Sequence, residues 1–137
     1  MPAAALLLAE GGGGVIQTAS FFTPGLSWRD RRVVSIARTR PAGFRGRSAE
    51  WLFPSAELLD AYRRGQVHPA EYRRRYLAQL EDVPAAEIVQ RLGADAILVC
   101  WERAGSFCHR RVLAEKIEKE LGILVPELRP APVREYA

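Results

Sequence analysis

The stretch ILVCWERAGSFCHRRVLAEKI, residues 97–117, decides the fold. Its first part, with Ala96 before it, is a short and nearly continuous apolar run, which predicts a strand covered on both faces of its sheet. The segment RAGS, residues 103–106, turns the chain. From about Phe107 to Gly122 the pattern predicts a helix that ends at a glycine. A strand that leads directly into a helix is the unit from which α/β folds are built.

The same alternation extends through the rest of the chain. Two more strands are predicted at residues 15–22 and 33–37, which are short and rich in β-branched or apolar residues. Pro126 places a last short strand, residues 123–128, on an edge of the sheet. A long loop, residues 38–54, precedes three helices predicted at residues 55–64, 69–80 and 84–92. We therefore predict an α/β fold: a three-layer αβα, Rossmann-like arrangement with a mostly parallel sheet of about four strands.

The length of 137 residues, 48% of them hydrophobic, suits one domain with a single core. We place this domain at residues 15–128, between an N-terminal arm, residues 1–14, and a C-terminal tail, residues 129–137. Four consecutive glycines at residues 11–14 favour a flexible arm, because ordering glycine is costly in conformational entropy. No apolar run approaches the roughly 20 residues that a membrane helix needs, so no membrane partner is expected. The sequence leaves the oligomeric state open.

The chain has only two cysteines, Cys100 and Cys108, which allow one disulfide at most. Small secreted domains usually contain several disulfides. The low cysteine count therefore predicts a reducing, cytoplasmic location in which both thiols are free.

The net charge of +4 is unevenly distributed along the chain. Residues 23–80 contain twelve arginines against five acids, a net charge of +7, whereas the remainder is at −3. A basic half suggests an anionic partner. The alternative is that several of these arginines, at positions 63, 64, 73, 74 and 75, lie on solvated helix faces and bind nothing.

Residues capable of chemistry gather where the predicted strands end. Ser20, Arg38, Cys100 and Glu102 lie at the carboxyl ends of strands, which is where open parallel sheets bind ligands. Cys108, His109 and Arg110 fall in the first turn of the helix that follows, where free backbone N–H groups and the helix dipole favour anions and thiolates. These two groups of side chains are expected to form one site.

The predicted roles follow from residue chemistry. Cys108 is the candidate nucleophile or general acid, and His109 or Glu102 would move the proton. The anion would be held by charge-assisted hydrogen bonds from arginines, with Ser20 and Cys100 completing the ligand-binding set Ser20, Arg38, Arg45, Cys100 and Arg110. The structural alternatives are that both cysteines are simply buried, that His109 is an exposed cap, and that Glu102 pairs with Arg38 to order the loop.

No cofactor or metal is predicted. Cys100, Cys108 and His109 are chemically suitable zinc ligands, with His68 as a fourth, and zinc is therefore kept as a minor alternative. The C-x₇-C-H spacing is not a standard zinc pattern, and adjacent Cys and His side chains rarely turn toward one ion. The chain also lacks the glycine-rich phosphate loops of nucleotide-binding proteins.

The chain resembles the domain-of-unknown-function family 488. The resemblance rests on SIARTRPAGFRG at residues 35–46, LFPSAELLDAYRRGQV at 52–67, EYRRRYLAQL at 71–80, ILVCWERAGSFCHRRVLAEKI at 97–117 and LGILVPEL at 121–128. It implies a compact α/β domain and a site built from the arginine loop and the cysteine segment, but no established reaction. The positions that match the characteristic motifs are Arg38, Pro41, Cys100, Glu102, Cys108, His109 and Arg110. Thr39 departs from the small residue expected there.

Three functions compete at this point. The favoured one is an enzyme or binding domain for a small anionic molecule, such as a nucleotide or sugar phosphate; a cysteine-dependent hydrolase or transferase fits this class. The second is a nucleic-acid-binding module that uses the basic half, with Trp28, Phe44 and Trp51 as stacking surfaces or, alternatively, as core residues. The third is a structural or interaction domain in which the cysteine segment only stabilises the fold.

Overall fold

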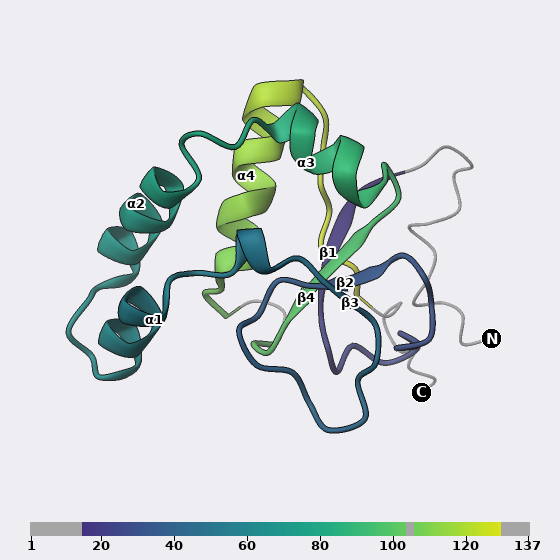
Figure 1. The fold of residues 1–137 in the computed structure, drawn as a ribbon, viewed down its shortest axis with the longest axis horizontal. Helices are drawn as coiled ribbons and strands as arrows, with labels where there is room; N and C mark the ends of the chain where they lie inside the picture. Colours follow the sequence, from purple (N-terminus) through teal and green to yellow (C-terminus); the bar gives the residue numbers. More distant parts are fainter. Residues whose placement is uncertain (1–14, 104–105, 130–137) are drawn as a thin grey trace, which may run out of the picture.

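The computed structural model describes residues 15–103 and 106–129. In chain order its elements are the strands β1 (Gln17–Ser20), β2 (Val33–Ser35) and β3 (Arg47–Ser48), the 3₁₀ helix η2 (Glu50–Leu52), the helices α1 (Ala56–Arg63), α2 (Pro69–Gln79) and α3 (Ala85–Leu92), the strand β4 (Ile97–Cys100) and the helix α4 (His109–Leu121). Figure 1 shows the strands at the centre, with α1 and α2 on one side and α3 and α4 above.

The four strands form one sheet in the order β1-β4-β2-β3, and every neighbouring pair is parallel. The register pairs Ser20 with Cys100 and Ser35 with Val99, so the carboxyl ends of β1, β4 and β2 lie at one edge. The predicted α/β fold with a mostly parallel sheet of about four strands in three layers is confirmed. β4 lies in the middle of this sheet, as its buried, apolar sequence predicts.

The helices pack on one face of the sheet. Side chains of Val34, Ile36 and Leu98 point from the sheet into this core, where apolar residues from α1 to α4 cover them. Tyr76 of α2 is fully buried there, and its hydroxyl donates a hydrogen bond to the Leu52 carbonyl at 2.6 Å. This bond satisfies the one polar group that the buried tyrosine brings into the core.

The opposite face of the sheet is covered by aromatic residues from the long connections after β1 and β2. Phe21 is at the centre of this cluster, and its ring meets those of Trp28, Phe44 and Trp101 edge to face, with centroids 5.2–6.3 Å apart. Among the described residues this layer is built from loops rather than helices (Figure 1). Trp28 and Phe44 thus serve the core, and Trp51 packs on the helix side.

The helix boundaries largely follow the sequence signals. Ser55 caps α1 by accepting a hydrogen bond from the Leu58 N–H, and Pro69 occupies the first turn of α2. Gly93 ends α3 with a φ of 105°, a backbone conformation that side chains with a Cβ rarely adopt. α4 starts at His109, two residues later than expected, because Cys108 is extended and takes the N-cap position.

Two strand predictions differ from the structure. The long loop contains β3, which is only two residues long and exposed, so it carries no apolar signal in the sequence. The predicted last strand is reduced to a single parallel bridge between Glu127 and Thr18, beside β1. Its backbone hydrogen bonds run from Thr18 to the Pro126 carbonyl and from Leu128 to the Thr18 carbonyl. Pro126 limits this pairing because it has no N–H to donate.

The arm at residues 1–14 and the tail from residue 130 lie outside the described residues, so the predicted domain limits stay a prediction. In the part of the chain that the structure describes, no helix combines the length and apolar character needed to span a membrane.

Candidate functional site

A narrow cleft opens at the carboxyl ends of β2 and β4. Its walls come from the segments that leave these strands, from α1 and α2, and from the start of α4; the lining includes Arg38, Arg63, Tyr72, Cys100, Glu102, Cys108 and His109. The predicted convergence of the arginine loop and the cysteine segment is therefore present in the geometry. The space inside it that the centre of a water molecule can occupy is about 30 Å³. This is room for one or two waters or one small chemical group.

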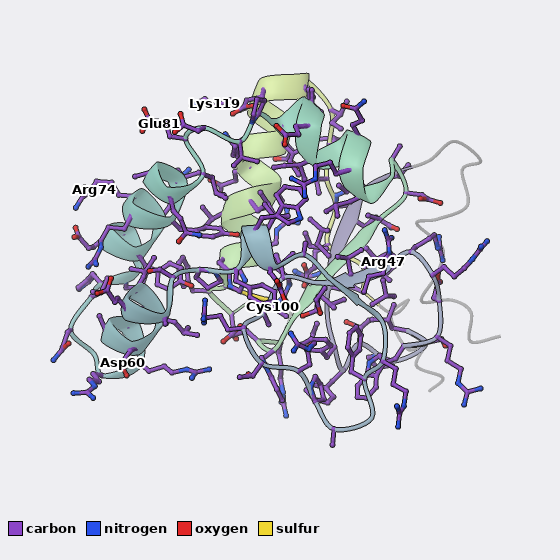
Figure 2. The ribbon with its side chains drawn as sticks, in the orientation of Figure 1. Arg47, Asp60, Arg74, Glu81, Cys100 and Lys119 are labelled. Atoms are coloured by element: carbon purple, nitrogen blue, oxygen red, sulfur yellow. A yellow bond between two sulfur atoms is a disulfide. The ribbon has the colours of Figure 1, made fainter. Side chains whose placement is uncertain are left out.

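The two cysteines are joined at the floor of this cleft. Cys100 ends β4 and Cys108 caps α4, and their sulfur atoms form a disulfide (Figure 2). The prediction of free thiols is therefore wrong for this structure. Counting cysteines missed the pairing because the eight-residue separation hides a reversal of the chain, which brings the end of the strand next to the start of the helix.

His109 is buried, and its orientation is fixed by the sheet. Its Nε2 lies 2.8 Å from the Ile36 carbonyl oxygen, which can only accept, so Nε2 carries the proton. Nδ1 is then the unprotonated nitrogen, and it faces the Cys108 sulfur at 3.8 Å. Burial lowers the pKa of His109 to about 4, so the ring is neutral at pH 7. His109 is thus held in one tautomer with a lone pair directed at sulfur.

Arg110 lies beneath the cysteines and is completely buried. Its guanidinium makes a two-point contact with Glu127, Nε to Oε1 at 3.0 Å and Nη2 to Oε2 at 2.7 Å. Burial alone would raise the pKa of Glu127, but hydrogen bonds from Arg110 and Thr18 outweigh it and hold that pKa below its usual value. The remaining nitrogen, Nη1, donates to the Cys100 sulfur at 3.1 Å.

The contacts of Arg110 change its predicted role. It was expected to hold an anionic ligand, but its charge is already paired with Glu127 and it does not line the cleft. What it can do is favour negative charge on the Cys100 sulfur when the disulfide is reduced. Sequence reasoning did not find Glu127, because the partner comes from the segment after α4 that pairs with β1.

The rim of the cleft carries charge of both signs. Glu102 is exposed, and its Oε1 lies 3.7 Å from the Cys100 sulfur. Arg38 donates from Nη1 to the Pro54 carbonyl at 3.3 Å. The suggested Arg38–Glu102 ion pair is not among the ion pairs of the described residues. Thr39, which departs from the expected small residue, holds the Trp101 ring: the indole N–H lies 2.9 Å from its carbonyl oxygen and 3.1 Å from its hydroxyl.

Besides Arg110, two predicted ligand residues lie away from the cleft. Ser20 is buried at the end of β1, where its hydroxyl accepts from the Phe22 N–H at 3.1 Å. Arg45 lies in an open depression at the opposite end of the sheet, with Arg29, Arg31, Arg32 and Arg47. Conversely, Arg63, Tyr72 and Phe107 line the cleft although sequence reasoning did not select them. These three residues reach the cleft because of where α1, α2 and the turn before α4 lie in the fold. No local sequence pattern indicates that position.

The arrangement combines three chemical capacities in one place. It has a disulfide, a neutral imidazole with one nitrogen available, and a carboxylate, and the rim of the same cleft bears two arginines. The sulfur atoms of Cys100 and Cys108 and a ring nitrogen of His109 lie within 4.8 Å of one another. The same set can serve nucleophilic, redox or metal-binding chemistry.

The sequence of the chain matches a known protein family. A family model described as "DUF488-N3a: Active DUF488-N3 subclade" matches residues 16–121, which covers most of the chain and all of the cleft. Comparison with curated proteins and with solved structures gave no significant match.

Proposed function

The chain belongs to the DUF488-N3a family, and we propose that its cleft binds a small ligand by an anionic group, such as a phosphate or carboxylate. The observation that supports this is the meeting of Arg38 and Arg63 with the cysteine pair around one cleft. Arginine suits this task because its planar guanidinium binds carboxylate or phosphate by two parallel hydrogen bonds.

The charges at the rim favour an anion. Arg38 and Arg63 are both exposed, and neither pairs with a carboxylate among the described residues. The small interior admits one functional group, so the remainder of a larger ligand, such as a nucleotide or sugar phosphate, would lie outside along α1. The proposed ligand is therefore a small molecule that inserts its anionic group into the cleft.

We assign the reactive chemistry to the reduced protein. Cys108 was predicted as the nucleophile with His109 as its base, but His109 accepts a proton poorly because burial lowers its pKa to about 4. Arg110 instead donates to the sulfur of Cys100 at 3.1 Å. Cys100 is therefore the better candidate for the thiolate, with Cys108 as the sulfur that joins it on oxidation.

The test is ligand binding to the reduced protein. Thermal shift and calorimetric titrations with phosphate, pyrophosphate, sugar phosphates and nucleoside monophosphates should find a ligand whose affinity falls about tenfold or more in Arg38→Ala. Arg63→Ala is expected to weaken it similarly. The matched controls are Arg64→Ala, next in sequence but outside the cleft lining, and Arg45→Ala at the other end of the sheet. Equal losses in the controls, or no ligand at all, would remove the proposal.

A second candidate function uses the open depression at the amino ends of β2, β3 and β4. Five arginines line it with Trp28, and two acids, Asp30 and Asp95, lie among them. Such a surface suits the backbone of single-stranded nucleic acid. Two observations weaken stacking there: Trp28 packs on the core cluster, and its indole N–H donates to the Phe21 carbonyl at 2.8 Å.

This candidate is tested by titration with single- and double-stranded oligonucleotides across salt concentrations. Binding that weakens steeply with salt and is reduced by an Arg29→Ala/Arg45→Ala double variant would support it. Weak binding that does not change with salt would exclude it. The cytoplasmic location inferred from the cysteine count also stays a prediction, to be tested by locating a tagged chain in its own cell.

A further inference from the structure

We infer that the reduced protein binds one zinc-class divalent ion through Cys100, Cys108 and His109, with Glu102 as the fourth ligand. This inference goes beyond the proposed ligand binding and does not depend on it. It is carried by three donor atoms at the floor of the cleft, those of Cys100, Cys108 and His109, by the contacts that fix them, and by the Glu102 carboxylate on the rim beside Cys100.

The sulfurs of Cys100 and Cys108 and a ring nitrogen of His109 lie within 4.8 Å of one another, and two donor pairs have the spacing of neighbouring ligands around a tetrahedral ion. With Zn–S bonds of about 2.3 Å and Zn–N or Zn–O bonds of about 2.0–2.1 Å, neighbouring ligand atoms lie roughly 3.5–3.7 Å apart. Nδ1 of His109 is 3.8 Å from the Cys108 sulfur, and Oε1 of Glu102 is 3.7 Å from the Cys100 sulfur. The Cα atoms of Cys100 and Cys108 are 7.7 Å apart. This leaves room for the sulfurs to separate around an ion once the bond between them is reduced.

The hydrogen bond of His109 to a backbone carbonyl orients its other ring nitrogen as a metal ligand. Metal-binding histidines usually donate their other ring N–H to a carbonyl or carboxylate, which fixes the tautomer and the ring orientation. Nε2 of His109 donates to the Ile36 carbonyl at 2.8 Å, and this directs the Nδ1 lone pair toward the sulfurs. Adjacent Cys and His side chains rarely face one ion, but here the donor atoms of Cys108 and His109 lie 3.8 Å apart. Cys108 is the extended N-cap of α4 and His109 its first helical residue, and both side chains line the cleft.

The Cys100 thiolate is likewise held in place by a hydrogen bond from a neighbouring side chain. Nη1 of Arg110 donates to the Cys100 sulfur at 3.1 Å, and Glu127 fixes the guanidinium from the other side. A hydrogen bond to a metal-bound thiolate is a common outer contact that holds the ligand in place. The ligand set is thus two soft sulfurs, one imidazole and one carboxylate, which suits zinc and cobalt(II) better than magnesium or calcium.

Oxidation and metal binding exclude each other at this site. A dithiol reductant converts the Cys100–Cys108 disulfide into two thiols and is itself oxidised to its own disulfide. Binding of the ion then releases the two thiol protons as both sulfurs become thiolates. Re-oxidation by a small-molecule disulfide, which is itself reduced to two thiols, forms the protein disulfide again, removes two ligands and releases the ion. The disulfide in this structure is therefore the metal-free state of the same site.

The test uses the full chain and does not require a variant. After reduction with a dithiol and removal of the reductant, the protein is titrated with Zn²⁺ alone in competition with a colorimetric chelator, and with Co²⁺ alone by absorption. The expected result is one equivalent bound, with sulfur-to-cobalt charge-transfer bands. The oxidised protein, measured in parallel, should bind less than a tenth as much. No binding by the folded, reduced protein, or equal binding by both forms, would overturn the inference.

Variants then identify the ligands. Cys108→Ser should remove about half of the charge-transfer intensity, and Glu102→Gln, on the exposed rim, should weaken zinc binding by about tenfold or more. His68→Asn is the matched control, because His68 is exposed and does not line the cleft. If His68→Asn lowers the affinity as much as the changes at the cleft, the ion is bound elsewhere and the inference fails. Phosphate affinity measured on the metal-free protein separates this result from the proposed anion binding.

Discussion

The two ends of the sheet both carry arginine, but they hold it differently. At the carboxyl end, Arg110 is completely buried and its position is set by Glu127 and the Cys100 sulfur. At the amino end, Arg29, Arg31 and Arg45 are exposed. Arginine content alone assigned the positive charge to residues 23–80, which contribute side chains to both ends of the sheet. Among the described residues, the arginine that is completely buried and held by fixed partners lies at the carboxyl end.

The largest expected effect concerns the buried ion pair. Glu127→Gln removes the negative partner of Arg110 and leaves a buried guanidinium unpaired, which should lower the free energy of unfolding by ~3 kcal/mol. Chemical denaturation under constant redox conditions measures this. The control, Glu87→Gln, removes an exposed ion pair with Arg91 and should cost less than about 1 kcal/mol. Equal costs at both positions would mean that the carboxyl end is no better ordered than the surface.

A similar effect is expected from acid in the oxidised, metal-free protein. Below pH 6.5 the unfolded chain protonates His109, whereas the folded protein resists protonation until about pH 4 because the ring is buried. His109 alone should therefore lower stability by roughly 3 kcal/mol as the pH drops from 7 to 4. The measurement is urea denaturation at several pH values, compared with His109→Gln. If the free energy of unfolding depends on pH in the same way in the wild type and in the variant, burial of the neutral ring is contradicted.

Reduction should have the next largest effect. The disulfide closes a loop with a sequence separation of eight residues, and opening it should lower stability by about 2 kcal/mol in the chain-entropy account. Thermal denaturation with and without a dithiol tests this, with Cys100→Ser/Cys108→Ser as the control that should not respond to the reductant. Recovery of the lost stability by Zn²⁺ would link this prediction to the metal site. Unchanged stability on reduction would show that other contacts alone hold the strand end to the helix.

The smallest effect is expected at the amino end. Arg45→Ala removes an exposed side chain with no ion pair among the described residues, so stability should change by less than about 0.5 kcal/mol. The comparison is with Arg32→Ala, whose guanidinium contacts Asp30 at 2.7 Å and is partly buried. A large loss at Arg45 would reveal a fixed partner at this end of the sheet and would remove the contrast between the two regions.

Most of the fold could be predicted because its elements carry local signals. Apolar runs mark β2 and β4, and Ser55, Pro69 and Gly93 mark helix ends through capping and backbone preferences that need no tertiary contact. β3 could not be predicted, since two exposed residues have no pattern. The last strand was overestimated because an apolar run before Pro126 resembles a strand whether or not its N–H groups find partners.

The candidate site was predicted in part for the same reason. The placement of Arg38, Cys100, Glu102, Cys108 and His109 around one cleft follows from parallel strands ending at one edge, which the sequence indicates. The contacts that decide their chemistry are not local: Arg110 with Glu127, and His109 with the Ile36 carbonyl, depend on packing across the sheet. Side-chain type predicts which residues can act, whereas burial and partners determine which of them do.

The bridge between Glu127 and Thr18 has a consequence for how the protein is made. During synthesis, Cys100, Cys108 and Arg110 leave the ribosome before Glu127 does, so the arginine emerges without the acid that will neutralise it. Arg110 therefore gains its neutralising carboxylate only when the segment that pairs with β1, the last part of the described chain to be synthesised, has joined the sheet.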